Sequence, residues 1–313
     1  MQEKQTDIQP ILEQGLTVRL KDPVIVNEGA STYPIKDDIW ANWLPFAYKA
    51  FRLISQENIR SFAAIGSGLG ADAIGAIYAF KGLQKIVVTD LDDKLVQTIE
   101  ENVKRHAGSI EVISGVGSLC NPLRKKGITV DLMYENLPNI PDSGNIIEGY
   151  RRASRFKLDA FKAVNEHAKK YLLESHFAFL LEARESLNPG GSVICSIGGR
   201  VPYNIIFSIF EQAGYRAEEV VAGFKIQTEP DEVLPGYANA EHGVEFDFYK
   251  YDEVAKRIDL KYLRTLQKIK GNDLKRYLLP ERITAKQSLR LYEKDPCYKI
   301  GHTIHMIRAW SIQ

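Results

Sequence analysis

Short apolar runs alternate along this chain with longer segments whose apolar residues recur at helical spacing. The first five runs are four to six residues long, too short for helices, and most end near glycine, proline or aspartate. Strands that alternate with helices are typical of an α/β fold with a parallel sheet. We therefore expect an α/β, Rossmann-like sheet of seven strands. These are Phe62–Ile65, Lys85–Thr89, Ile110–Ser114, Val130–Tyr134, Ser192–Ile197, Glu219–Gln227 and Val244–Tyr251.

The first predicted strand ends in a glycine-rich turn, and a helical pattern follows it. Glycines at alternate positions let a ligand lie directly against the backbone, because no Cβ intervenes, and a helix N-terminus behind such a turn favours anionic groups. A carboxylate in the first turn of that helix, at Asp72, suits the helix dipole. A glycine turn without a ligand is the alternative. The residues predicted to contact a cofactor here are Ile65, Gly66, Ser67, Gly68, Gly70 and Asp72.

The second predicted strand ends at Asp90, 20 residues after Gly70. An acid at this place can accept hydrogen bonds from both hydroxyls of a ribose, so we predict that Asp90 and its neighbour Leu91 bind the ribose of the cofactor. Asp92 and Asp93 suit the cap of the next helix. After the third strand, Gly117 and Ser118 are predicted to contact the base of the cofactor through the backbone or the serine hydroxyl.

Candidate substrate residues follow the later strands. Arg200 stands behind two glycines where the fifth strand meets a helix, and its forked guanidinium suits a carboxylate; a salt bridge within the core is the alternative. The polar loop 228–243 offers acids for an ammonium group, and Glu229 and His242 are our candidates there. A patternless loop of this length is more often functional than structural filler. Tyr203, at the start of the helix after Arg200, completes this group.

An aromatic segment precedes the glycine turn. Residues Ile39–Ser55 form a candidate helix that Pro45 should kink or split. Its aromatic side chains, with Tyr33 before it, either pack on the sheet or form a lid over the site, and Tyr33, Trp40 and Trp43 are the lid candidates. The chain thus divides into an N-terminal cover (1–57), a core (58–251) with a helical insertion (142–187), and a C-terminal extension (252–313). The extension ends in a predicted edge strand, His302–Trp310, and either a dimer contact or a second cover would explain it.

Composition narrows the class of protein. Of the 313 residues, 41 are basic and 40 acidic, a balance of charge that does not point to nucleic acid. The three cysteines match no metal-binding spacing, and no metal is expected. The polar N-terminus lacks the apolar core of a signal peptide, and no apolar run is long enough to span a membrane. We expect a cytoplasmic enzyme with a small-molecule substrate.

The G-x-G-x-G spacing resembles the first motif of class I S-adenosylmethionine (SAM) methyltransferases, whereas a dinucleotide site would need a glycine at Ala71. The loop that contains Asn136 and Pro138 resembles the N-P-P-Y loop of methyltransferases that act on nitrogen, with Leu137 and Asn139 as departures. The resemblance implies that SAM is the cofactor and S-adenosylhomocysteine the product. It also implies that Asn136 lies at the transferred methyl group. The family usually has an acid where this chain has Ala64, so the amino end of SAM needs another partner, such as Asp72.

More closely, the chain resembles methionine S-methyltransferases. The shared stretches are Asp37–Trp40, Leu137–Ile140, Gly198–Pro202, Lys225–Asp231 and Glu245–Phe248. This resemblance implies S-methylation of methionine, a reaction in which the thioether carries no proton and needs no general base. Arg200 would then bind the substrate carboxylate, while Tyr33, Trp40, Pro138 and Tyr203 would shape an apolar slot. N-methylation of another amino acid or amine is the first alternative, and SAM binding without catalysis is the second.

Overall fold

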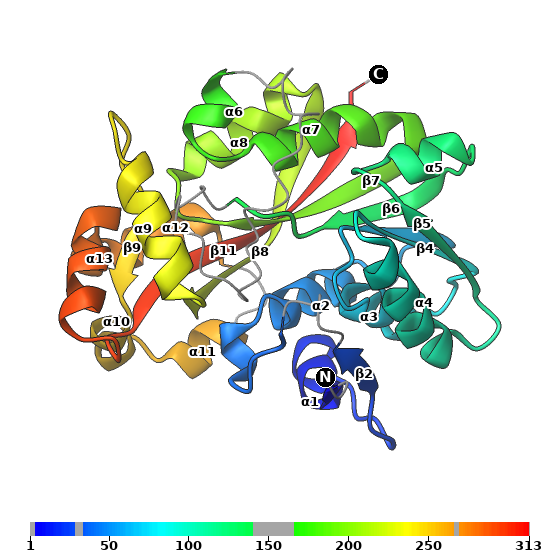
Figure 1. The fold of residues 1–313 in the computed structure, drawn as a ribbon, viewed down its shortest axis with the longest axis horizontal. Helices are drawn as coiled ribbons and strands as arrows, with labels where there is room; N and C mark the ends of the chain where they lie inside the picture. Colours follow the sequence, from blue (N-terminus) through cyan, green and yellow to red (C-terminus); the bar gives the residue numbers. More distant parts are fainter. Residues whose placement is uncertain (1–3, 29–33, 140–165, 266–268, 313) are drawn as a thin grey trace.

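The computed structural model describes residues 4–28, 34–139, 166–265 and 269–312. A sheet of nine strands runs through the described part of the chain and separates two layers of helices (Figure 1). Its strands are β3 (Ser61–Ile65), β4 (Lys85–Asp90), β5 (Glu111–Val116), β6 (Val130–Glu135), β7 (Leu187–Gly198), β8 (Tyr215–Ile226), β9 (Phe248–Lys250), β10 (Arg282–Ile283) and β11 (Ile300–Ser311).

The strand order is that of a doubly wound sheet. From one side it reads β5-β4-β3-β6-β7-β11, and β8 pairs with the other edge of β11. The pairs among β5, β4, β3, β6 and β7 are parallel, whereas β11 is antiparallel to its three partners β7, β8 and β9. The chain leaves β3 on one side toward β4 and later returns on the other side as β6, which creates a switch point where ligands bind in such sheets. The predicted Rossmann-like fold is confirmed, and β10 and β11 are present in the sheet in addition to the seven predicted strands.

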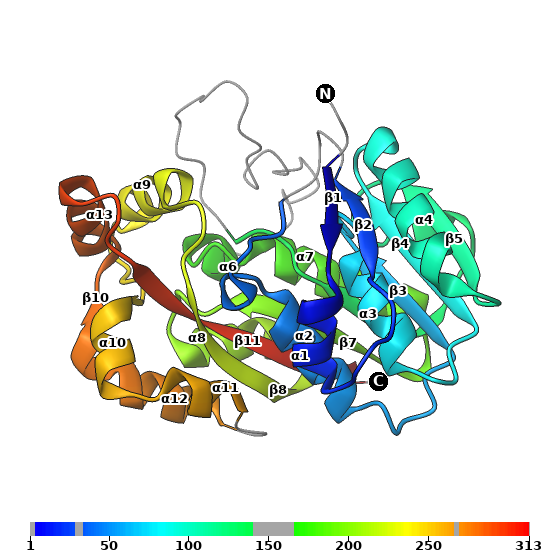
Figure 2. The same ribbon diagram turned by 90° about the horizontal axis from the view of Figure 1, so that it is seen from below.

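The prediction that the last strand lies at a sheet edge is wrong. β11 lies between β7 and β8, and Ile304 pairs with Gly198 on one side and Gly223 on the other (Figure 2). It is buried over Ile300–Ala309, including the polar residues His302, Thr303, His305 and Arg308, as a strand covered on both faces is. The segment assigned to a C-terminal extension therefore supplies a central strand. Val244–Tyr251, predicted as the seventh strand, contains only the short β9.

Helices before and between the first strands cover one face. Phe51 of α2 packs against Phe62 and Tyr134, at ring-centroid distances of 5.5 and 5.2 Å. The predicted break at Pro45 is confirmed, because a 3₁₀ turn precedes α2 and the proline lies in the first turn of α2, where no amide donor is needed. The helices of this layer are α1 (Gln9–Leu16), η1 (Ile39–Ala41), α2 (Leu44–Leu53), α3 (Ala71–Ala79) and α4 (Asp93–Ala107). A separate two-stranded sheet consists of β1 (Lys4–Asp7) and β2 (Ile25–Glu28).

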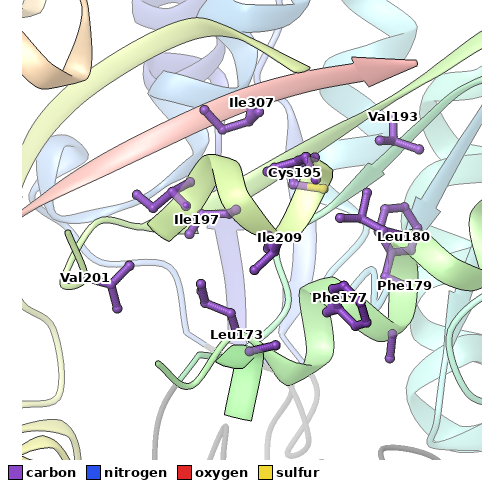
Figure 3. Packing of buried hydrophobic residues seen from close by; sticks show 14 of the residues in the cluster. Leu173, Phe177, Phe179, Leu180, Val193, Cys195, Ile197, Val201, Ile209 and Ile307 are labelled. Carbon is purple, nitrogen blue, oxygen red and sulfur yellow. The ribbon is translucent and has the colours of Figure 1, made fainter. Parts of the chain in front are cut away.

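The opposite face packs on helices that follow β5, β6 and β7. Cys195 and Ile197 of β7 lie against Phe177 and Ile209 of two helices (Figure 3). The described residues of the helical insertion form two helices, and the strand predicted at Ser192–Ile197 begins earlier, at Leu187, with a register shift against β6 over Asn188–Gly191. The helices are α5 (Asn121–Lys125), α6 (Glu166–Lys170), α7 (Glu174–Ala183), η4 (Arg184–Ser186) and α8 (Tyr203–Gln212).

The region after β8 is helical. The segment expected to be a patternless loop contains α9, which runs through Pro235 and buries Val233, Leu234 and Tyr237. Apolar residues at this spacing are typical of a helix that packs on a core, so the interpretation as a polar loop is wrong. The elements are α9 (Pro230–Ala240), α10 (Tyr251–Arg257), α11 (Leu260–Thr265), α12 (Gly271–Leu278), η5 (Leu279–Glu281) and α13 (Ala285–Lys294).

Candidate functional site

The glycine turn lies at the carboxyl end of β3, beside the switch point of the sheet. Gly66, Gly68 and Gly70 have φ angles of 65°, 57° and 78°, the left-handed region that favours glycine. The room for a side chain differs between Gly68 and Gly70. A Cβ at Gly70 would lie 2.9 Å from Val103 Cγ2, whereas a Cβ at Gly68 would meet nothing within 4 Å. Ser67 Oγ donates to the Ala64 carbonyl over 2.7 Å and stiffens the turn. The turn is thus packed from behind at Gly70 and open at Gly68.

Asp90 ties the turn to the end of β4. Its carboxylate accepts from the Gly68 amide (3.0 Å) through Oδ2 and from the Leu91 amide (2.8 Å) through Oδ1. Burial raises the pKa of Asp90, and the two amide donors oppose that shift because they favour the ionised form. Each carboxylate oxygen keeps a lone pair for a further donor. The two oxygens are therefore suited to the paired hydroxyls of a ribose.

The residues expected at the base of the cofactor lie next to Asp90. The Gly117 amide donates to the Asp90 carbonyl over 2.9 Å. Ser118 Oγ is buried and makes no hydrogen bond to any residue that the structure describes. A buried hydroxyl without a partner costs free energy, and it is suited to an exocyclic amine or ring nitrogen of a bound base. The structure thus brings the turn, Asp90 and Ser118 to one edge of the sheet.

Asp72 lies in the first turn of α3 and is only 5% exposed. Trp43 Nε1 donates to its Oδ1 over 3.2 Å, and no basic side chain of the described chain pairs with it. Burial raises the pKa of Asp72 to about 7, although Trp43 and Tyr134 favour the ionised form. Tyr134 is the register partner of Ala64, so both side chains face α3. An acid is therefore present near Ala64, on the helix instead of the strand.

The loop after β6 is held by a buried pair that we did not predict. Glu135 and His176 are fully buried, and His176 Nδ1 lies 2.7 Å from Glu135 Oε1. Glu135 Oε2 accepts from the Leu137 amide over 2.7 Å, and Ser175 Oγ donates to the Pro138 carbonyl over 2.8 Å. Glu135 and His176 are 41 residues apart, so no local pattern could connect them. Their contacts fix the backbone that carries the half-buried Asn136 and its neighbour Leu137, whose Cδ2 would lie 3.1 Å from a Cβ at Gly66.

Arg200 is buried and its described partners are neutral. Nε donates to Gln227 Oε1 (2.7 Å) and Nη1 to Asn139 Oδ1 (2.9 Å), while Nη2 lies 3.4 Å from His302 Nε2. The guanidinium carbon stands 5.3 Å from the ring centroid of Tyr237. No carboxylate of the described residues forms an ion pair with Arg200, so the core salt bridge considered as an alternative is not observed there. A buried guanidinium with neutral partners is suited to an anionic ligand.

Glu229 lies in the same region as Arg200. It is the N-cap residue of α9 with a φ of 55°, and its Oε1 pairs with Lys36 Nζ over 3.3 Å. Its Oε2 is buried without a hydrogen-bond partner among the described residues. A carboxylate oxygen of this kind can accept from an ammonium group. The α9 cap thus places one acid close to the basic residues at the ends of β8 and β11.

Other predicted substrate residues are elsewhere. Tyr203 Oη donates to Glu219 over 2.9 Å and its ring packs on His305, which faces the opposite side of β11 from His302. His242 is exposed beyond the end of α9. Trp40 is half-buried in η1 and packs edge-on against Phe46 at 5.6 Å. Tyr33 lies outside the described residues.

The described residues offer neither a metal-binding cluster nor a helix that could cross a membrane. Within them, no group of three or more histidine, cysteine, aspartate or glutamate side chains is arranged to hold a metal ion. None of the helices over the same ranges combines the length and apolar character that a membrane crossing requires.

No family model matches the chain. Among solved structures, the ribosomal protein L11 methylase of Lactobacillus delbrueckii subsp. bulgaricus is 18% identical, with a TM-score of 0.40 over 57% of this chain and 72% of the other. The precorrin-6y C5,15-methyltransferase of Geobacter metallireducens GS-15 is 9% identical, with a TM-score of 0.44 over 93% and 100%. TrmN of Thermus thermophilus is 17% identical, with a TM-score of 0.36 over 58% and 44%. The fold assignment rests on the strand order of this sheet.

Proposed function

We propose that this protein is a SAM-dependent methyltransferase whose acceptor is a small amino acid, most simply methionine. One observation carries the proposal: Arg200, a buried guanidinium with neutral described partners, lies on the same carboxyl edge of the sheet as the glycine turn and Asp90. The turn and Asp90 are suited to a nucleoside, and Arg200 is suited to a carboxylate.

Two separate groups of residues would bind SAM and the acceptor. Ile65–Gly70, Asp90 and Leu91 would hold the ribose, and Gly117 and Ser118 the adenine. Asp72 would take the ammonium group of the methionine end of SAM, because it is a buried acid without a described basic partner. When bound, SAM supplies a methyl group on an electrophilic sulfonium. Asn136 and Pro138 would border that methyl group, since their loop packs on Gly66.

The acceptor would lie between Arg200 and the glycine turn. Arg200 would fix its carboxylate and Glu229 Oε2, buried without a described partner, would accept from its ammonium. A thioether acceptor carries no proton, so orientation and exclusion of water would supply the rate enhancement. Trp40 and Tyr33 remain proposed as cover residues.

The test is to incubate the protein with SAM and each of the twenty amino acids, and to follow S-adenosylhomocysteine formation and a product heavier by one methyl group. S-Methylmethionine is the expected product. Total RNA and a mixture of denatured proteins are included as acceptors. Transfer to either of these and to no amino acid would contradict the proposal, and transfer to an amine with a rate limited by its deprotonation would establish the N-methyl alternative.

A further inference from the structure

A second buried cation lies beside Arg200. Lys225 is the next-to-last residue of β8 and is 6% exposed, close to the 5% exposure of Arg200. Its register partner on β11 is His302, so the two side chains face the same side of the sheet. His302 Nε2 in turn lies 3.4 Å from Arg200 Nη2. Lys225 and Arg200 therefore flank one histidine from two different elements.

His302 is neutral in this arrangement. Its Nδ1 lies 2.7 Å from the Thr303 carbonyl, which can only accept, so Nδ1 carries the proton and Nε2 presents a lone pair to Arg200. Burial, with Arg200 and Lys225 nearby, holds the pKa of His302 well below its usual range. The histidine thus separates the two cations without adding charge or compensating theirs.

The described acids do not balance these cations. The Nζ of Lys225 donates to the Ile226 carbonyl over 2.9 Å and forms no ion pair with an acid of the described residues. Burial, helped by Arg200 and Lys36 and opposed by Glu229 and Asp38, lowers the pKa of Lys225 to about 7. Of the two acids, Glu229 already pairs with Lys36 at 3.3 Å, and Asp38 accepts from the Trp40 amide as the cap of η1. Neither Arg200 nor the charged form of Lys225 has a carboxylate partner among the described residues, so both are available to an anionic group.

We propose that Lys225 is a second binding residue for the acceptor, and that one carboxylate bridges Lys225 and Arg200. The proposal rests on the proposed function and adds a specificity residue to it. Arg200 has five N–H donors, of which three contact Gln227, Asn139 and His302. The remaining two can meet one carboxylate oxygen, while Lys225 meets the other. The acceptor class is then a free α-amino acid, because an amide or ester at this carbon would offer no negative charge to Arg200 and Lys225.

The test uses binding, in the presence of S-adenosylhomocysteine, and does not need turnover. Calorimetry gives dissociation constants of the twenty amino acids, and for each binder the constant of its decarboxylated amine, such as 3-(methylthio)propylamine for methionine. Lys225→Met should weaken the amino acid about tenfold or more, because a charge-assisted contact is lost, and should leave the amine within about twofold. Lys225→Gln serves as the second variant if Lys225→Met fails to fold.

Lys49→Met is the matched control, because Lys49 is another partly buried lysine, with a pKa lowered to about 8, on α2. It should leave both constants unchanged. Equal losses for the amino acid and the amine would overturn the proposal, and so would an unchanged amino-acid constant in Lys225→Met or the absence of any binder among the twenty. Binding without methyl transfer would instead contradict the proposed function and leave Lys225 in its binding role.

Discussion

The guanidinium of Arg200 donates to the side-chain oxygen of Asn139 over 2.9 Å, across 61 residues of sequence. Asn139 also donates to the Gly198 carbonyl over 3.0 Å, so the loop after β6 and the loop after β7 are joined by one amide. Because the first loop carries Asn136 and Pro138, the contact couples the proposed methyl-transfer end of the site to the proposed carboxylate end.

Arg200→Lys should raise the KM for the acceptor about 10- to 100-fold, because a point charge replaces a fork that makes several charge-assisted hydrogen bonds. The KM for SAM should change less than about threefold, since no predicted SAM residue contacts Arg200. Steady-state kinetics with each substrate varied in turn measures both. Equal increases in the two constants would remove Arg200 from the carboxylate role, and thermal unfolding of the variant identifies a loss caused by misfolding.

Asp90→Asn should weaken S-adenosylhomocysteine about 10- to 100-fold, because an amide offers one acceptor oxygen to the ribose instead of two charged ones. Asp92→Asn is the control. Asp92 caps α4 by accepting from the Lys94 amide over 2.9 Å, so asparagine there should keep both the cap and the affinity. Calorimetric titration of both variants tests this, and equal affinity of Asp90→Asn and the wild type would refute the ribose assignment.

Asp72 should make the free protein less stable as the pH rises. Its pKa of about 7 when folded exceeds the usual value of 3.8, so the folded state binds more protons than the unfolded state between these values. Relative to Asp72→Asn, the wild type should lose about 4 kcal/mol of unfolding free energy between pH 4 and pH 8. Urea unfolding of both proteins over this range gives the difference. If the unfolding free energies of the two proteins change with pH in the same way, burial does not raise the pKa of Asp72.

His176→Ala should destabilise the protein by about 3–5 kcal/mol, because it leaves the carboxylate of Glu135 buried without its partner. The double variant His176→Phe with Glu135→Gln removes the charge as well and should recover part of that loss. Chemical unfolding of the three proteins measures the effect. A loss below about 1 kcal/mol in His176→Ala would mean that water replaces the histidine.

Deletion of residues 300–313 should abolish folding, because β11 pairs with both β7 and β8 and its loss would open the sheet in the middle. Deletion of residues 312–313 alone retains all of β11 and should leave the protein folded. Circular dichroism and size-exclusion chromatography compare the two. A folded product from the longer deletion would restore the interpretation of this segment as an extension.

The local sequence was sufficient for the strand and helix pattern up to β7, the glycine turn and Asp90. These features depend on residues close in the chain, namely apolar periodicity, glycines that adopt positive φ, and an acid one helix and one strand after the turn. Asp92 as a helix cap is of the same kind. Local backbone preferences decide them, so they could be predicted without knowledge of the rest of the chain.

Only the tertiary structure decided which distant residues meet. β11 has the alternating and apolar character of either an edge or a central strand, and its insertion between β7 and β8 follows from the packing of the whole sheet. The same pairing places His302 opposite Lys225 and so creates a basic cluster around Arg200 that no local pattern indicates. Arg200 and Asp90 could be predicted individually, because the two glycines before Arg200 and the strand that ends at Asp90 indicate their positions. The residues that surround them come from distant parts of the chain, and no fixed sequence spacing indicates which of those residues will meet.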